Sequence, residues 1–266
     1  MITGCMKMLV CGVDVGAATA KSVILKDTNM IAYSILPTGH SVKMIAERAV
    51  KEALGKAKLL NAKFDYVVST GWGRHSIPFA NKAVTEIICH GKGAKFLISS
   101  TQTVVDIGGQ DSKVISLDES GNVINFVMND KCAAGTGRFL EVMANVLEFQ
   151  LDQMGEISLT SQHPCSISST CTVFAETEVV SLRADGSERN DLIAGIHYSV
   201  ASRVYILGKS LGYTKDVVFT GGVAKNIGVK HALERLIGME MLVPEESQIV
   251  GALGAALIAQ EALSHS

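Results

Sequence analysis

The chain has 266 residues and a formal net charge of −2 at pH 7, with 47% hydrophobic and 19% charged residues. This size and composition suit one large or two ordinary globular domains with real cores. The small net charge gives no general attraction to nucleic acid or an anionic membrane, and no apolar run reaches the roughly 18 residues that span a bilayer.

The first residues do not have the pattern of a signal peptide, because Lys7 and Asp14 interrupt a short apolar run. The chain carries six cysteines, and in a protein that is not secreted these are expected to be reduced thiols. We therefore expect a cytoplasmic protein that binds neither nucleic acid nor membrane.

The first apolar run, residues 8–16, ends in Asp14-Val15-Gly16, and residues 17–21 turn the chain back into further runs at 22–25 and 31–36. This pattern predicts an antiparallel meander with a tight first turn. A glycine at such a turn lets backbone amides approach a phosphate, and the preceding aspartate can hold Mg²⁺ through water. One Asp-x-Gly is weak evidence, because many hairpins contain it.

Residues 42–60 have the three-and-four apolar spacing of an amphipathic helix, and 66–69 read as a buried strand. The loop that follows holds Trp72, the only tryptophan, which we expect to pack rather than to bind. A helical run at 85–90 places Glu86 and His90 one turn apart; with no third ligand in view, a hydrogen-bonded or solvated pair is favoured over a metal site.

The second half repeats the first. Asp106-Ile107-Gly108 again ends an apolar strand and is followed by a turn, by Lys113, and by strands at 114–117 and 123–128. A duplicated hairpin is much stronger evidence for phosphate binding than a single one, since two such turns can grip a polyphosphate from both sides.

Two cysteines lie just before amphipathic runs. Cys132 precedes a run at 139–147 and Cys171 a run at 173–182, so both thiols should lie near helix N-termini, where open amides and the helix dipole stabilise a thiolate. That setting suits a metal cluster. Taken singly, each cysteine is more often an apolar filler of the core, and the spacing alone does not identify a site.

The remaining chain predicts a long helix at 191–211, a strand at 217–220 that runs into a helix start at Gly221-Gly222, a strand at 239–243 and a helix at 249–262. A base or ribose can lie flat on backbone at such a Gly-Gly segment, although an ordinary strand-to-helix turn explains it equally well. The last helix carries a Gly251-Ala-Leu-Gly254-Ala-Ala face suited to close packing.

Together, these motifs resemble the phosphate and adenosine motifs of the actin-like ATPase superfamily. Within it, four segments closely resemble the activators of 2-hydroxyacyl-CoA dehydratases, and the ATP-binding subunits of benzoyl-CoA reductase are similar. The segments are Val105–Asp111, Met128–Phe139, Ser169–Glu176 and Gly251–Ala256. The match runs from Asp14 to Ala256.

The resemblance implies an α/β fold of two actin-like, ribonuclease H-like domains, residues 1–101 and 102–266, with an ATP cleft between them and a last helix able to pack back on the first domain. It implies that ATP or ADP and Mg²⁺ bind there, with Asp14 and Asp106 in the catalytic centre and Gln110 orienting the attacking water. The implied nucleotide ligands are Asp14, Gly16, Ala17, Ala18, Thr19, Lys21, Asp106, Gly108, Gly109, Gln110, Gly135, Thr136, Gly221, Gly222 and Val223.

The resemblance further implies a homodimer with one 4Fe–4S cluster on its two-fold axis, ligated by Cys132 and Cys171 of each subunit. Such a cluster takes four thiolates, and symmetry would supply the second pair. Cys5, Cys11, Cys89 and Cys165 fall outside the pattern; Cys11 reads as strand core, and Cys165 is a less favoured ligand.

The implied function is an ATPase that drives a low-potential electron from the cluster to a 2-hydroxyacyl-CoA dehydratase, with reduced ferredoxin or flavodoxin as the electron donor. Three alternatives stay open: an ATP-binding subunit of a benzoyl-CoA-type reductase, a small-molecule kinase on the same scaffold, and a nucleotide-dependent binding protein with structural cysteines.

Three departures from the family pattern stand out. Ala17 and Ala18 replace small hydroxyl residues, which puts a side-chain contact to phosphate in doubt and leaves the backbone amides. Trp72 stands where tyrosine is usual, and Gly91 where alanine is commoner.

Overall fold

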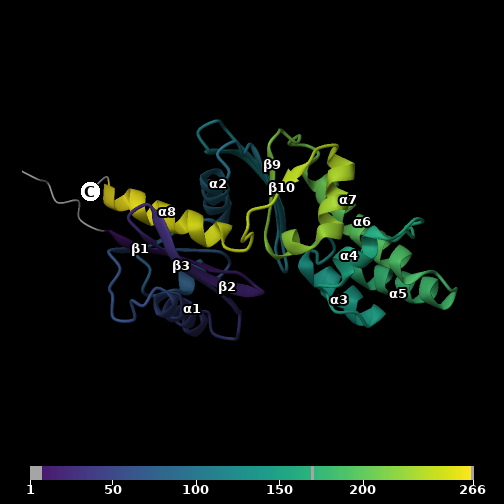
Figure 1. Ribbon diagram of the computed structural model, residues 1–266, viewed down its shortest axis with the longest axis horizontal. Helices are drawn as coiled ribbons and strands as arrows, with labels where there is room; N and C mark the ends of the chain where they lie inside the picture. Colours follow the sequence, from purple (N-terminus) through teal and green to yellow (C-terminus); the bar gives the residue numbers. More distant parts are fainter. Residues whose placement is uncertain (1–7, 169–170, 265–266) are drawn as a thin grey trace, which may run out of the picture. The chain divides into compact units, whose positions relative to one another are not determined.

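The computed structural model describes residues 8–168 and 171–264 of the chain. The chain divides into two compact units, of which the first is Met1–Ser99 with Gln248–Ser266 and the second is Ser100–Ser247. Figure 1 follows the chain through both units. Cys5, Ser169 and Thr170 lie outside the described residues.

The first unit is built on a five-stranded sheet of order β3-β2-β1-β4-β5. The predicted meander is confirmed, because β1 pairs antiparallel with β2, and β2 with β3. Strand β4 then lies parallel to β1 on its other side, and β5 parallel to β4. The strands are β1 (Leu9–Val15), β2 (Thr19–Lys26), β3 (Asn29–Pro37), β4 (Tyr66–Thr70) and β5 (Lys82–Ala83).

Alternate residues of β1 face two different cores, as the pleat of a strand requires. Cys11 packs in the core that α1 (Val42–Lys56) covers, whereas Val10 packs against α8 (Val250–Ser264). Helix α2 (Glu86–Leu97) packs on α8, and a short 3₁₀ helix, η1 (Arg74–Ser76), follows β4. The helical run predicted at 85–90 is the first part of α2, which continues to Leu97.

Glycines set the distance between α8 and its neighbours. A Cβ on Gly12 of β1 would overlap the carbonyl oxygen of Ala252, and a Cβ on Gly254 would overlap that of Cys89 in α2. Helix α8 thus lies with its backbone directly on β1 and α2. The predicted role of the small-residue face in close packing is confirmed.

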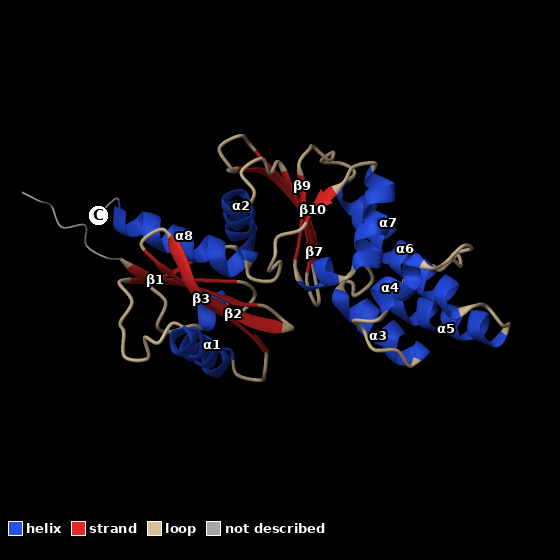
Figure 2. Cartoon of the chain, in the orientation of Figure 1, coloured by secondary structure: helices blue, strands red, loops and turns tan. Residues whose placement is uncertain are grey.

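The second unit repeats the topology with a sheet of order β10-β9-β6-β7-β8. Strands β6, β7 and β8 form an antiparallel meander, and β9 lies parallel to β6 with β10 outside it. The strands are β6 (Thr103–Ile107), β7 (Ser112–Leu117), β8 (Val123–Asn129), β9 (Val217–Thr220) and β10 (Met241–Leu242), drawn in red in Figure 2.

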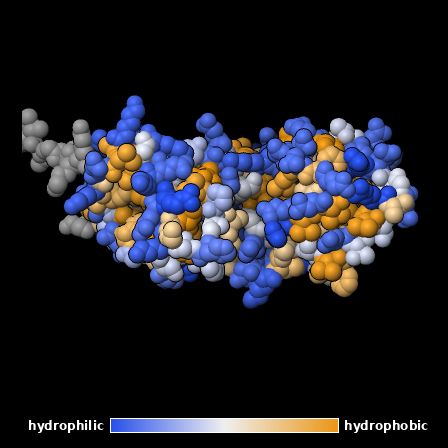
Figure 3. All heavy atoms as spheres, turned by 90° about the horizontal axis from the view of Figure 1, so that it is seen from below, coloured by the Kyte–Doolittle hydropathy of each residue, from blue (hydrophilic) through white to orange (hydrophobic). Residues whose placement is uncertain are grey.

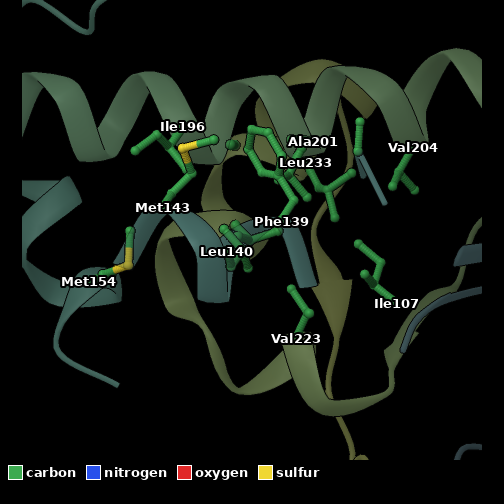
Figure 4. Close-up of a cluster of buried hydrophobic side chains, with 14 of the residues drawn as sticks. Ile107, Phe139, Leu140, Met143, Met154, Ile196, Ala201, Val204, Val223 and Leu233 are labelled. Atoms are coloured by element: carbon green, nitrogen blue, oxygen red, sulfur yellow. The ribbon is translucent and has the colours of Figure 1, made fainter. Parts of the chain in front are cut away.

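Five α-helices belong to this unit among its described residues. They are α3 (Gly137–Leu147), α4 (Met154–Leu159), α5 (Thr172–Ala184), α6 (Arg189–Gly208) and α7 (Ile227–Ile237). Figure 4 shows how Phe139 and Met143 of α3 meet Ile196 of α6 in one core. No helix in the described part of the chain has the length and apolarity that crossing a membrane requires.

Candidate functional site

The first hairpin carries a largely buried ion pair at the end of β1. Asp14 and Lys21 face each other across the β1–β2 ladder, and Lys21 Nζ donates to Asp14 Oδ2 at 3.1 Å. The Gly16 amide donates to the Thr19 carbonyl at 3.0 Å and closes the turn, which leaves Ala17 and Ala18 exposed at its tip. The tip thus offers backbone amides, with a carboxylate and an ammonium group just below it.

The second hairpin has the same geometry. Lys113 Nζ lies 3.3 Å from Asp106 Oδ2, and the Gly108 amide donates to the Asp111 carbonyl at 2.9 Å. Gln110 is exposed at the tip, in the place that Ala18 takes in the first turn. Asp111 adds a second carboxylate, 2.9 Å from Lys113 Nζ, so this hairpin is the more acidic of the two.

The neighbouring strand fixes the second carboxylate further. Thr220, at the end of β9, donates its hydroxyl hydrogen to Asp106 Oδ1 at 2.8 Å. A charge that is almost fully buried requires such partners, since an unpaired one would carry a large desolvation penalty. Asp106 therefore has a single fixed orientation at the carboxyl edge of the sheet.

Gly221 follows Thr220 in a conformation that favours glycine, with φ of 87°. A Cβ here would overlap the carbonyl oxygen of Ile107, so the segment lies directly on β6. Gly222 and Val223 begin a 3₁₀ helix, η2 (Gly222–Lys225), rather than an α-helix. The predicted helix start at Gly221-Gly222 is thus confirmed as a 3₁₀ helix, and α7 begins after it, where the side chain of Asn226 accepts from the Val229 amide.

The second hairpin is hydrogen-bonded to the first turn of α3. The amides of Gly137 and Arg138 donate to the carbonyls of Gly108 and Gly109, at 2.9 and 2.8 Å. A Cβ on Gly137 would also approach Val223 within 3.3 Å. The phosphate turn, the start of α3 and the Gly-Gly segment therefore form one connected group.

Gly135 and Thr136 lie at this junction in different roles. Gly135 has φ of 87°, and a Cβ on it would press on the side chain of Arg203. Thr136 is fully buried, and its hydroxyl donates to the Ala133 carbonyl at 2.7 Å. This hydrogen bond of the Thr136 hydroxyl stabilises the loop before α3.

The predicted nucleotide ligands accordingly gather in two places, one in each unit. In the first unit they are all in the β1–β2 hairpin: Asp14, Gly16, Ala17, Ala18, Thr19 and Lys21. In the second unit they come from the β6–β7 hairpin, the start of α3 and the segment after β9: Asp106, Gly108, Gly109, Gln110, Gly135, Thr136, Gly221, Gly222 and Val223.

Cys132 lies in a loop that a single side chain braces. Asn129, the last residue of β8, donates through Nδ2 to the carbonyls of Cys132 and Ala134, at 2.8 and 3.3 Å. Its Oδ1 accepts from the Cys132 amide at 3.2 Å. The thiol is half-buried, and the bracing holds its backbone in place without using the sulfur.

Cys171 is the N-cap residue of α5, and its sulfur makes no capping hydrogen bond there. Helices α3 and α5 pack on each other, and Arg183 near the end of α5 donates to the carbonyl of Val146 near the end of α3 at 2.9 Å. The C-terminal ends of the pair are thereby joined. Cys171 is at the opposite, N-terminal end of α5, and Cys132 lies in the loop that precedes α3.

The other described cysteines have different surroundings. Cys11 and Cys89 are fully buried, and burial raises the pKa of each thiol to about 12. A thiolate is the metal-binding form, so these two are poor ligands. Cys165 is half-buried, and its amide donates to the Asp191 carbonyl at 3.0 Å.

The prediction that Trp72 packs is wrong, because its side chain is 74% exposed. Glu86 pairs with Arg74, Nη1 to Oε2, at 3.1 Å, and the hydrogen-bonded or solvated pair of Glu86 and His90 stays a prediction. Two residues with clear roles at the candidate site were missed, Asn129 and Thr220. Asn129 lies within the segment Met128–Phe139 and Thr220 directly before Gly221, but nothing in the sequence indicates the hydrogen-bond partner of either side chain.

Comparison with known proteins places the chain among ATPases. The family model for the BadF/BadG/BcrA/BcrD ATPase family matches residues 11–259. The activator of lactoyl-CoA dehydratase from Anaerotignum propionicum is 48% identical over 256 residues, which are 96% of this chain and 98% of that protein.

Two solved structures are similar over almost the whole chain. The activator of the 2-hydroxyisocaproyl-CoA dehydratase from Clostridium difficile, with bound ADPNP, is 45% identical with a TM-score of 0.92, covering 97% of this chain and 96% of that one. Component A of the (R)-2-hydroxyglutaryl-CoA dehydratase from Acidaminococcus fermentans is 46% identical with a TM-score of 0.93, covering 97% and 99%.

The fold expected from the motifs, two α/β units of the actin-like ATPase type, is thus confirmed, and so is the resemblance to the dehydratase activators. The chain is an ATP-binding ATPase. It belongs to the BadF/BadG/BcrA/BcrD ATPase family.

Proposed function

We propose that the chain is the ATP-dependent activator of a 2-hydroxyacyl-CoA dehydratase, to which it passes an electron from a 4Fe–4S cluster shared by two copies of the chain. The observation that carries the proposal is a pair of half-buried thiols: Cys171 is the N-cap residue of α5, and Cys132 lies in the loop before α3, the helix on which α5 packs. Relatives at 45 to 48% identity are named activators of such dehydratases, so the reductase-subunit and kinase alternatives are not favoured.

The donor set fits the cluster. Thiolates are the soft ligands that iron–sulfur clusters take, and Cys171 lies at the N-terminal end of α5, where the helix dipole stabilises a negative charge. Among the described residues, no three His, Cys, Asp or Glu side chains are grouped as in a metal site. Cys132 and Cys171 are two donors, so four thiolates would come from a symmetric pair of chains. A bound cluster would supply one-electron transfer at low potential.

The surface beside Cys171 supports a shared site. Val173 and Phe174, in the first turn of α5, are 66% and 68% exposed. Figure 3 shows hydrophobic residues on the surface at the end of the second unit that carries α3 and α5. A second copy of the chain would remove such side chains from water.

The hairpin carboxylates and amides are the proposed ligands of ATP and Mg²⁺. Turn amides suit phosphate oxygens, and Asp14 and Asp106 suit Mg²⁺ or its water ligands. Gln110, exposed at the second tip, is the proposed group that orients the attacking water. Lys21 and Lys113 would offset the phosphate charge.

The hydrogen bonds between the second hairpin and α3 offer a route from hydrolysis to the thiols. A change at Gly108 or Gly109 acts directly on the amides of Gly137 and Arg138. Thr136 and Ala133 continue the connection to the loop of Cys132. The nucleotide state would thereby alter the surroundings of a cluster ligand, which is a lever on reduction potential.

Reduced ferredoxin or flavodoxin is the proposed electron donor, and the cytoplasm the proposed compartment. Both follow from the low potential and the reduced thiols that this chemistry needs.

The proposal predicts the metal content of four proteins purified without oxygen. Wild type should hold about four irons and four sulfides per dimer, the content of a cluster with four thiolate ligands. Cys132→Ser and Cys171→Ser should lose nearly all of both, because serine oxygen is a poor ligand for this iron. Cys165→Ser is the matched control, a half-buried thiol outside the proposed set, and should keep its iron.

The measurements are iron and acid-labile sulfide assays with an ultraviolet–visible spectrum, alongside ATP hydrolysis. Both serine variants should still hydrolyse ATP, whereas Asp106→Asn should keep its iron and lose hydrolysis. A colourless wild-type dimer that hydrolyses ATP and takes up no cluster on reconstitution would contradict the proposal.

A further inference from the structure

Trp72 stands in a loop that its neighbours hold in place. The amide of Gly73 donates to the carbonyl of Val15 at 2.9 Å. Gly71 has φ of 82°, and a Cβ on it would overlap Asp14 Oδ1. The backbone on both sides of Trp72 therefore lies directly against the end of β1.

The other side of the loop is tethered as well. Arg74 Nη1 donates to the Gly71 carbonyl at 3.0 Å and to Glu86 Oε2 at 3.1 Å. A Cβ on Gly73 would meet the methyl groups of Val42 and Val15 at 2.7 and 3.0 Å. The loop thus has a defined place, while the indole itself stays 74% exposed.

The loop lies at the end of the first sheet where the parallel strands β1 and β4 have their C-terminal residues. Strands β1 and β4 are parallel neighbours, with Asp14 paired in register with Thr70. Ligands of open α/β sheets bind outside the carboxyl ends of adjacent strands. The phosphate turn follows β1 at this edge, and the loop of Trp72 follows β4 at the same edge.

We propose that Trp72 contacts the phosphate end of bound ATP and covers it from solvent. The indole offers a flat apolar face that excludes water and one N–H donor for a phosphate oxygen. Excluding water strengthens the electrostatic interactions of Asp14, Lys21 and the turn amides with the phosphates. The inference rests on the assignment of the first hairpin to ATP, and it makes Trp72 a contact residue for a nucleoside triphosphate.

Because Trp72 is the only tryptophan, its fluorescence reports on this one position. Binding of Mg²⁺ with ADP, ADPNP or inorganic tripolyphosphate should shift the emission to shorter wavelength and protect the indole from acrylamide. Adenosine alone should do neither, since the contact is to phosphate. Calorimetric titrations run in parallel establish that each nucleotide binds.

The control is a variant that carries its only tryptophan at a different position. In the double variant W72F/F96W the tryptophan stands on α2, at a site where the wild-type phenylalanine is 51% exposed. Its emission should not respond to tripolyphosphate. Trp72→Ala should raise the KM for ATP roughly tenfold with unchanged iron content, and Trp72→Phe, which keeps the flat face, should raise it less.

Three results would overturn the inference. The first is that ADPNP binds in calorimetry without changing the emission of Trp72, while Trp72→Ala leaves the KM for ATP unchanged. In that case the first hairpin would still be assigned to ATP. Emission that responds only to an added dehydratase component would make Trp72 a docking residue instead. A wild-type protein that binds no nucleotide at all would overturn the hairpin assignment together with the inference.

Discussion

His197 on α6 is a buried imidazole outside the proposed ligands. Its Nε2 lies 3.2 Å from Asn226 Nδ2, while Asn226 Oδ1 accepts from the Val229 amide. The amide group of Asn226 is therefore the donor, and the neutral ring carries its proton on Nδ1. Burial lowers the pKa of His197 to about 4.

This pKa predicts a loss of stability in acid. An unfolded histidine titrates near 6.5, so between about pH 6.5 and 4 the unfolded chain binds a proton that the folded chain does not. The contribution is fully present above pH 6.5 and is lost as the pH falls towards 4, by about 3 kcal/mol in all. His197→Gln should flatten this part of the curve of unfolding free energy against pH, measured by urea denaturation.

His231→Gln is the control for that series, because it removes an exposed imidazole from the same unit. It should follow the wild-type curve. A His197→Gln protein with the wild-type slope would show that the buried ring is not the group responsible.

For single residues, the sequence predicts those that stand in a chemical motif. It does not predict roles that depend on which residues come into contact in the fold. Asp14, Asp106, Cys132 and Cys171 stand in recognisable motifs. The exposure of Trp72 could not be read, because it depends on how β4 pairs with β1.

At the scale of elements, both hairpins were predicted correctly because their signals are local. An apolar run, a turn glycine and a lysine fix the pairing of β1 with β2 and of β6 with β7. Two short elements were missed, β5 with two residues and α4 with six, because neither is long enough to show a period. The equally short β10 was predicted, since it lies within a longer run at 239–243. The parallel pairing of β6 with β9 could not be predicted from the sequence either, because most of the second unit's sequence separates the two strands.

The close packing of α8 yields a prediction for its glycines. Gly254→Ala should destabilise the protein by about 2 to 3 kcal/mol, since the new methyl group would overlap the Cys89 carbonyl oxygen and force the helices apart. Gly39→Ala is the matched control, with no heavy atom within 4 Å of the added Cβ. It should change the unfolding free energy in urea by less than about 0.5 kcal/mol. Equal stability of the two variants would contradict the packing argument.

At the scale of the whole chain, the same strand order occurs in both units, and the sequence showed this duplication through its two Asp-x-Gly motifs. The units differ in the number of chain segments that form them. The second is one uninterrupted stretch, whereas the first is closed by residues from the far end of the chain. Helix α8 supplies Leu253 and Ala256, among others, to a core that also contains Val10 and Val68.

A chain that stops at Ser247 should therefore lose the first unit and keep the second. Without α8, one face of the β1–β4 sheet is left in water, so limited proteolysis should cut within residues 8–99 and spare most of 100–247. Mass spectrometry of the fragments is the measurement. A chain that stops at Ser264 is the control and should resist the protease as wild type does. Equal resistance of both units after removal of α8 would refute the role assigned to the helix.

The position of α8 in the chain also sets an order of folding during synthesis. The second unit can complete its core as soon as its own residues have left the ribosome, although it is made later than most of the first. The first unit waits with one face of its sheet uncovered until the last helix emerges, roughly 8 to 33 seconds after Ser99 has been made at ordinary rates of translation. Nascent chains of this protein should therefore depend on chaperones through their N-terminal half.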